Sequence, residues 1–98
     1  MQVEFDDDNL DRLETDPHFT AGFSQEIVRA YRKRMQQIRG FRDERDFQAL
    51  RSLNFEKLRG DRVGQYSIRL NLQWRLILEI HGDHPCKVVQ IIEVVDYH

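Results

Sequence analysis

The sequence predicts one α+β domain, in which a layer of helices packs on a single sheet. Most of the strand signal lies in the second half of the chain, where apolar and polar residues alternate or apolar residues run together. The strongest helix signal, apolar side chains at helical spacing, lies in residues 24–39. The length of 98 residues fits one domain, because domains cluster at roughly 100–150 residues.

A chain of this size can bury one core but has little room for an enclosed cofactor pocket, so we expect a surface groove and no cofactor. The single cysteine, Cys86, excludes an internal disulfide and a cysteine-only metal cluster, and it fits a reducing compartment. His81 and His84 lie three apart, but no cysteine or acid spacing completes a ligand set, so no metal site is expected.

A hairpin is predicted in residues 65–80. Apolar side chains alternate with polar ones on both sides of a short break at residues 71–73, namely Tyr66, Ile68, Leu70, Trp74, Leu76, Leu78 and Ile80. A period of two is typical of strands that are half buried on one face. If the even-numbered positions face the core, Arg69 and Arg75 share the opposite face of the sheet.

A third long strand is predicted in residues 87–95, where almost every residue is apolar, as in a central strand covered on both faces. A turn at residues 81–85 separates it from the hairpin. The chain ends on Asp96, Tyr97 and His98. Because side chains alternate along a strand, we expect Asp96 and His98 on one side and Tyr97 on the other.

The start of the chain predicts a short strand and a short helix. Residues 2–5 alternate like a strand, and Asp7 or Asp8 can cap a brief helix that ends at Glu14. Residues 15–23 form a loop.

The longest helix is expected to begin after Ser24, which is a good N-cap, and to run to about Arg39. Gly40 is the preferred kind of residue to stop it. Its apolar stripe consists of Ile27, Tyr31, Met35 and Ile38.

A further short helix is predicted from Asp43 to about Ser52. Residues 55–58 then begin the sheet, and residues 59–62 form a turn in which Gly60 can take a positive φ.

The net charge of −2 hides a strong asymmetry. Residues 1–23 carry seven acids and one arginine, whereas residues 24–80 carry thirteen bases and seven acids. Such a cationic body is either solvated surface or a contact for a nucleic acid or another acidic partner. No apolar run approaches the roughly 20 residues needed to cross a bilayer, and the acidic start is unlike a signal peptide, so we expect a cytoplasmic protein without membrane contact.

Four motifs follow one another in the second half of the chain: LRGDR at 58–62, GQYSIR at 64–69, QWR at 73–75 and DYH at 96–98. With them the chain resembles the HigB-type toxins of bacterial type II toxin–antitoxin systems, in the RelE/ParE superfamily, also described as plasmid maintenance killer proteins. The order of elements is similar over residues 1–98, which implies a single toxin domain. The resemblance implies a RelE-like α+β fold, with two or three helices packed on a mainly antiparallel sheet of about four or five strands.

The usual activity of this family is ribosome-dependent endonucleolytic cleavage of mRNA in the decoding site. Its usual partner is a helix-turn-helix antitoxin of HigA type, which inhibits the toxin and represses the shared operon. The resemblance therefore implies an endoribonuclease whose partners are the ribosome, mRNA and an antitoxin, and which meets operator DNA only through the antitoxin. The alternative is a non-catalytic toxin or binding module of the same fold, such as superfamily members that inhibit DNA gyrase by contact.

Matched residue by residue, the family's terminal acid, tyrosine and histidine fall on Asp96, Tyr97 and His98. Its arginine after tryptophan falls on Arg75, and a basic residue before the Gly-Asp of the turn falls on Arg59. The resemblance implies that these five residues are the catalytic ones.

Metal-independent RNA cleavage needs a base for the 2′-hydroxyl, cations for the charge that builds on phosphorus, and an acid for the leaving 5′-oxygen. His98 suits either proton-transfer role, because the unperturbed histidine pKa is about 6.5. Asp96 would orient it or take the complementary role, and the sequence leaves open which is base and which acid. Arg75 and Arg59 would hold the scissile phosphate, Arg75 bidentately. Tyr97 would stack on a base or position a phosphate, unless it belongs to the core.

Lys57, Arg62 and Arg69 are expected to bind the RNA backbone without regard to sequence. For Arg69 the alternative is an ion pair with an acid across the sheet. One position departs from the family: some members place a catalytic histidine three residues before the basic residue of the turn, and this chain has Glu56 there. That departure puts a two-histidine mechanism in doubt.

Overall fold

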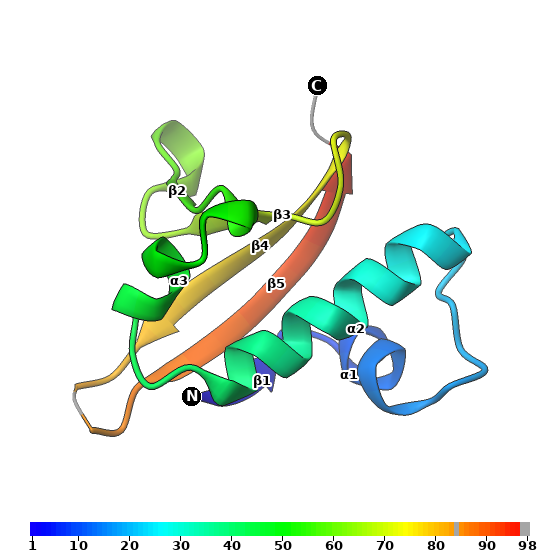
Figure 1. The fold of residues 1–98 in the computed structure, drawn as a ribbon, viewed down its shortest axis with the longest axis horizontal. Coiled ribbons are helices and arrows are strands. Elements are labelled where there is room, and N and C mark those ends of the chain that lie inside the picture. Colours follow the sequence, from blue (N-terminus) through cyan, green and yellow to red (C-terminus); the bar gives the residue numbers. More distant parts are fainter. Residues whose placement is uncertain (84, 97–98) are drawn as a thin grey trace.

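A computed structural model defines residues 1–83 and 85–96 (Figure 1). In chain order, its strands, α-helices and 3-10 helices (η) are β1 (Gln2–Phe5), α1 (Asp8–Thr15), α2 (Gln25–Gly40), α3 (Arg45–Ala49), η1 (Arg51–Leu53), β2 (Glu56–Lys57), η2 (Gly60–Arg62), β3 (Tyr66–Arg69), β4 (Trp74–His81) and β5 (Val88–Asp96).

In these residues three α-helices pack on a five-stranded mixed sheet, which confirms the predicted α+β class. The strands lie in the order β1-β5-β4-β3-β2. β1 runs parallel to β5, and all other neighbours are antiparallel, with β3 and β4 forming the predicted hairpin. Figure 1 shows α2 lying along the sheet with α1 beside it. Within the part of the chain that the structure defines, no helix is both long enough and apolar enough to cross a membrane.

Side chains cap both of the longer helices as the sequence predicts. Asp7 Oδ1 accepts a hydrogen bond from the Leu10 N–H at 3.1 Å, and Ser24 Oγ accepts one from the Ile27 N–H at 3.3 Å. Each bond satisfies a backbone donor that has no partner inside its helix. The predicted apolar stripe of α2 is buried and forms the centre of the core together with the even-numbered residues of β3 and β4.

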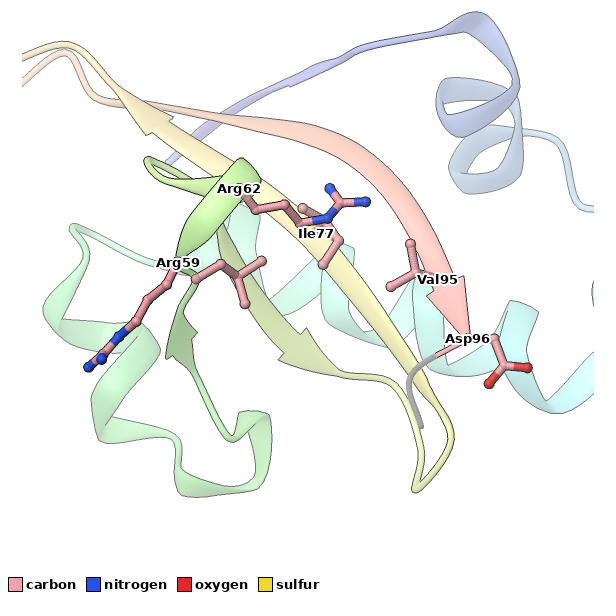
Figure 2. Close-up of a pocket in the computed structure, with 6 residues that line it drawn as sticks. Arg59, Arg62, Ile77, Val95 and Asp96 are labelled. Atoms are coloured by element: carbon pink, nitrogen blue, oxygen red, sulfur yellow. The ribbon is translucent and has the colours of Figure 1, made fainter.

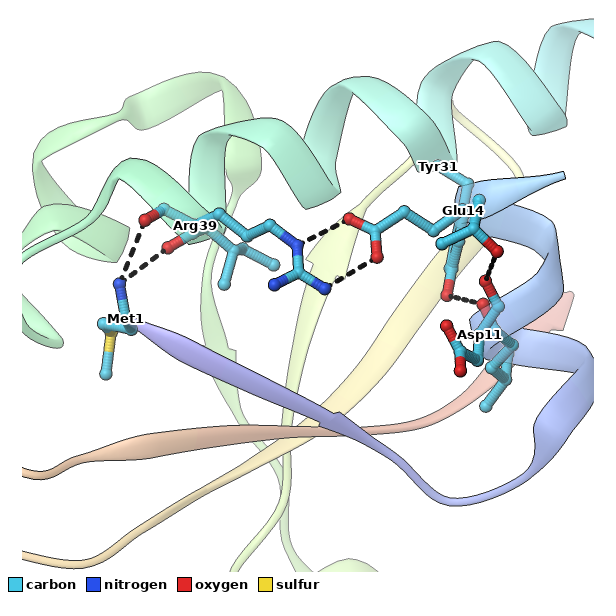
Figure 3. Close-up of polar contacts among 8 residues, drawn as sticks. Met1, Asp11, Glu14, Tyr31 and Arg39 are labelled. Atoms are coloured by element: carbon cyan, nitrogen blue, oxygen red, sulfur yellow. Dashed lines mark hydrogen bonds and ion pairs between the residues drawn. The ribbon is translucent and has the colours of Figure 1, made fainter. Parts of the chain in front are cut away.

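The C-terminal end of α2 differs from the prediction. Gly40 does not take a positive φ to stop the helix; α2 continues through Gly40, and Phe41 is its C-cap. The main-chain oxygens of Ile38, Arg39 and Phe41 accept hydrogen bonds from the Met1 ammonium group. Figure 3 shows this group below the end of α2, beside Arg39. A positive charge is favourable at this end of a helix, so these carbonyl groups are satisfied without a left-handed turn.

The prediction of one continuous helix from Asp43 to about Ser52 is wrong. The structure has α3 and then η1, separated by Leu50, whose φ of −90° and ψ of 89° are not helical. The predicted cap at Asp43 is also wrong, because the N-cap of α3 is Glu44 and no side chain caps this helix; Asp43 Oδ1 accepts a hydrogen bond from the Arg45 backbone N–H at 2.9 Å. The strand expected at residues 55–58 is also shorter, because only β2 pairs with β3.

Aromatic rings anchor the segment between α2 and the hairpin. Phe41, Phe47, Phe55 and Tyr66 contact one another in a row, with ring centroids 4.8, 5.1 and 4.9 Å apart. Phe47 is fully buried. This row fixes the path of the chain from the end of α2 to the edge of the sheet, where the chain passes to the opposite face.

Several basic side chains of α2 are used inside the fold. Arg34 is buried and donates to the Arg69 main-chain oxygen at 3.0 Å. Arg39 binds Glu14 through two hydrogen bonds of 2.7 Å (Figure 3). Arg32 donates to three main-chain oxygens at the end of α1 and after it, those of Leu13, Asp16 and Phe19. These arginines hold α1 and β3 against α2, so they do not form a continuous cationic surface for a partner.

The third long strand is not covered on both faces, as its apolar composition had suggested. Val89 and Ile91 are buried against the helices, whereas Val88 and Val95 remain half-exposed. The apolar run therefore marks a strand between two neighbours in a two-layer fold, with one face left partly open.

A β-bulge changes the side on which the last residues of β5 lie. Leu78 pairs with Ile91, but its neighbour Ile77 pairs with Glu93, so Ile92 is an extra residue in β5. Beyond the bulge the alternation of side chains is reversed relative to a regular strand.

Tyr31 provides a test of the core. Its hydroxyl donates to the Leu10 main-chain oxygen at 2.8 Å, so Tyr31→Phe should lower the free energy of unfolding by about 1 kcal/mol near neutral pH. Burial, and then the carboxylates of Glu14 and Asp11, raise the pKa of Tyr31. The folded phenol therefore stays neutral while the unfolded one ionises above about pH 10, and stability is lost as pH rises.

The phenylalanine variant has no phenol to ionise, so its stability does not fall in this way. The difference in free energy of unfolding between the two proteins should therefore shrink above about pH 10. Urea unfolding of both proteins at neutral and alkaline pH measures it. A difference that stays constant or grows with pH would contradict the buried neutral phenol.

Candidate functional site

A groove of about 520 Å³ lies on the face of the sheet that is turned away from α2 (Figure 2). One wall is η2, and the floor is formed by β4 and β5. Its lining residues are Leu58, Arg59, Arg62, Ile77, Val95 and Asp96.

The floor of the groove follows from the strand register. Ile77 lies between Leu76 and Leu78, which belong to the core under the helices, so its side chain points to the opposite face. Residues paired directly across neighbouring strands share a face. One such row crosses β2, β3, β4 and β5, and consists of Glu56, Ser67, Ile77 and Glu93.

The turn at η2 carries two arginines of the groove. Gly60 has a φ of +64°, as predicted, which allows the chain to turn sharply after β2. Figure 2 shows the two side chains leaving η2 in different directions: Arg62 lies over Ile77 on β4, and Arg59 points away from the sheet. Arg62 forms an ion pair with Glu93 on β5, reaching across β4.

A chain of polar contacts continues from this ion pair along the same face. Arg62 Nη1 donates to Gln65 Oε1 at 2.8 Å, and Gln65 Nε2 donates to Glu79 Oε2 at 3.0 Å. Glu79 also contacts His81 at 2.7 Å. The hydrogen bond from Gln65, and to a lesser extent that from His81, lowers the pKa of Glu79 despite the opposing effect of burial. Gln65 therefore connects the Glu79 carboxylate to the guanidinium of Arg62 through two hydrogen bonds.

Arg75 lies beneath the groove rather than on its surface. As predicted, it shares a face with Arg69, its direct partner in the hairpin. However, Arg75 is only 5 % exposed, and its Nε donates to Ser67 Oγ at 3.0 Å. Its Nη2 donates to the Asn54 main-chain oxygen at 2.6 Å. Two of the N–H groups needed for bidentate phosphate binding are thus used to tie the segment before β2 to the sheet.

The bulge in β5 determines where Asp96 lies. Asp96 pairs with Trp74, and its Oδ2 accepts a hydrogen bond from Gln73 Nε2 at 3.0 Å. In Figure 2 its carboxylate points away from Arg59 and Arg62, although the residue lines the end of the groove. Tyr97 and His98, the other residues of the predicted terminal site, lie outside the residues that the structure defines.

The remaining predicted residues are divided between the two faces of the sheet. Lys57 pairs with Tyr66, which packs on the core, so Lys57 lies on the helix side of the edge strand. Arg69 is half-exposed at the end of β3, on the groove side. Glu56 is exposed and also faces the groove side, at the start of the row that ends at Glu93.

Sequence reasoning did not identify Glu93 or the apolar lining residues Leu58, Ile77 and Val95. The one available signal was Glu93 itself, an acid within the apolar run of residues 87–95. The bulge that directs it toward Arg62 leaves one trace in the sequence, because Gln90 and Glu93 lie three apart and would be on opposite faces of a regular strand.

Within the defined residues, no group of three or more histidine, cysteine, aspartate or glutamate side chains is arranged to hold a metal ion. The groove itself offers the guanidinium groups of arginines and a few carboxylates, on an otherwise apolar floor. This combination suits a polyanion whose charged groups contact the arginines and whose apolar parts lie on the floor.

Two solved structures are similar to this chain over its whole length. A YoeB/ParE toxin from Agrobacterium tumefaciens has a TM-score of 0.62 and 16 % sequence identity, with 100 % of both chains covered. A YoeB dimer from Staphylococcus aureus has a TM-score of 0.52 and 16 % identity, with 100 % of this chain and 97 % of that chain covered. At this identity the likeness shows the RelE-type fold alone. No curated protein matches the sequence.

The match to a protein family is more specific. The family of RelE-like toxins of the type II toxin–antitoxin system HigB matches residues 3–98. This confirms the resemblance carried by the four motifs, and it implies an antitoxin partner. The chain therefore belongs to the HigB-like toxins of type II toxin–antitoxin systems.

Proposed function

We propose that this toxin is an endoribonuclease that cleaves mRNA on the ribosome, by metal-independent attack of the ribose 2′-hydroxyl on the scissile phosphate. The observation that carries the proposal is the open groove with Arg59 and Arg62 in its wall and Asp96 at its end. The last three residues of the sequence add a carboxylate, a phenol and an imidazole, and together with the groove arginines these are the groups that this reaction needs.

The arginines act at the phosphates. Arg59 is exposed and extends from η2 into solvent, so it can hold the scissile phosphate and stabilise the charge that develops there. Arg62 contacts a neighbouring phosphate of the same strand. Arg75 adds its positive charge from beneath the floor, where low exposure strengthens its field, while its hydrogen bonds keep Ser67 and Asn54 in place.

Proton transfer is assigned to the chain terminus. His98 acts as base or acid, and Asp96 orients it or takes the complementary role. The hydrogen bond from Gln73 holds the Asp96 carboxylate beside the last residues of the chain, on the side of the strand turned away from Arg59 and Arg62. Tyr97 stacks on a base or positions a phosphate.

Two further bases act outside the groove. Arg69 binds the RNA backbone where the strand leaves the groove at the end of β3. Lys57, on the other face of the edge strand, contacts RNA that passes around this edge. The partner is a helix-turn-helix antitoxin of HigA type, which covers the cationic groove with an acidic or apolar segment or holds the toxin away from the ribosome. Operator DNA is bound through the antitoxin, and the toxin acts in the cytoplasm, where translation takes place.

The first test is primer extension on a reporter mRNA after brief induction of the toxin in cells that lack the antitoxin. Wild-type toxin should produce new 5′ ends inside the reading frame, and His98→Ala should produce none. The same variant should keep its fold and its binding to the antitoxin, because it removes one imidazole at the chain end. Growth arrest by the variant, or by wild type with intact mRNA, would contradict the nuclease and favour a toxin that acts by contact, such as a gyrase inhibitor.

A second test separates the groove from cationic surface elsewhere. Arg59→Ala should reduce the cleavage rate about 10- to 100-fold, because it removes a charged hydrogen-bond donor worth about 1.5–3 kcal/mol. The matched control is Arg29→Ala on α2, an exposed arginine on the other side of the sheet, and it should change the rate less than twofold. Equal effects of the two substitutions would argue against a phosphate site at Arg59.

A further inference from the structure

We propose that Glu93 competes with the RNA phosphate for Arg62 and so sets the affinity of the groove for RNA. In the RNA-free protein Glu93 pairs with Arg62, and a phosphate takes its place when RNA binds. The proposal rests on the function proposed above and assigns Glu93 an affinity-determining role in it.

The ion pair depends on the bulge in β5. Glu93 is the direct partner of Ile77, whose side chain forms the floor of the groove. The extra residue Ile92 places the carboxylate on this face. Arg62 crosses β4 to reach it, so the guanidinium lies over Ile77 (Figure 2). The negative charge closest to Arg62 therefore lies within the space that a substrate strand would cross.

The exposure of the pair makes exchange possible. The side chains of Arg62 and Glu93 are 41 % and 44 % exposed. Ion pairs at this exposure contribute only about 0–1 kcal/mol, since solvent screens them and both side chains lose freedom. A phosphate oxygen offers the same guanidinium a charge-assisted hydrogen bond, together with the positive potential of Arg59 and Arg75 nearby.

Gln65 keeps the arginine in position during this exchange. Its Oε1 accepts from Arg62 Nη1 while its Nε2 is bound to Glu79. Arg62 therefore keeps its hydrogen bond to Gln65 when Glu93 is displaced, so its guanidinium stays over the floor of the groove. The arrangement predicts a ligand with several phosphates, because such a ligand can contact Arg59 as well as Arg62 when it replaces Glu93, whereas a single anion contacts Arg62 alone.

The test is the affinity of the purified full chain for a short single-stranded RNA with 2′-O-methyl riboses, which cannot be cleaved by 2′-hydroxyl attack. Fluorescence anisotropy gives the Kd. Glu93→Gln should tighten binding about fivefold, since it removes the competing charge at nearly unchanged shape. Glu26→Gln, an exposed acid on α2 with the same change in net charge, should alter the Kd less than twofold.

A double variant identifies the partner of Glu93. When Arg62→Ala is already present, Glu93→Gln should give a gain of less than twofold, because the guanidinium for which it competes is gone. Glu93→Ala should reproduce the gain of Glu93→Gln if the glutamine substitution disturbs the strand. Unchanged or weaker binding of both Glu93 variants would overturn the proposal, and so would an equal gain with and without Arg62.

Failure of this proposal can be told apart from failure of the proposed nuclease activity, because RNA binding and mRNA cleavage are measured separately. If Glu93→Gln tightens RNA binding through Arg62 while reporter mRNA remains intact in cells, the competition stands and the nuclease is wrong. If mRNA is cut but the Glu93 variants bind like wild type, the nuclease stands and the competition is wrong.

Discussion

The helices cover only one face of the sheet, and the other features of the structure depend on this constraint. The apolar stripe of α2 packs against Ile68, Leu76 and Leu78, and this packing fixes the register of the hairpin. A one-residue slip would turn these side chains toward water, so the odd-numbered residues have to occupy the opposite face. That face carries Arg62, Arg69 and Arg75, and the segment that crosses it is the short 3-10 helix η2, not an α-helix.

The basic residues of the chain fall into two groups with different roles. Arg32, Arg34 and Arg39 are bound to main-chain oxygens or to Glu14 and hold the helical layer together. Arg75 is the structural cation of the other face. A buried guanidinium is costly unless its donors are bonded, and Ser67 and Asn54 supply acceptors. Its position keeps the base of the groove rigid while Arg59 and Arg62 remain accessible to a ligand.

Local signals predicted the parts of the fold that depend on local interactions. The N-caps at Asp7 and Ser24, the hairpin and the positive φ of Gly60 were all predictable, because neighbours in sequence determine them. The bulge was not, although its trace is the spacing of Gln90 and Glu93, which lie three apart and would be on opposite faces of a regular strand. The burial of Arg75 depends on the Asn54 carbonyl, which is brought close only by the tertiary fold. The ion pair of Arg62 with Glu93 joins residues 31 positions apart and was missed for the same reason.

The bulge in β5 also has a consequence for how such a chain can diverge. Replacing Ile92 by another apolar residue would leave the pattern of the strand intact. Deleting it would restore a regular strand in which Glu93 follows Ile91 directly, so Glu93 and Val95 would still pair with Ile77 and Arg75 and stay on the groove side. The strand can therefore lose this one residue, whereas losing a residue between Glu93 and Asp96 would turn Asp96 to the other face while Glu93 keeps its partner Ile77.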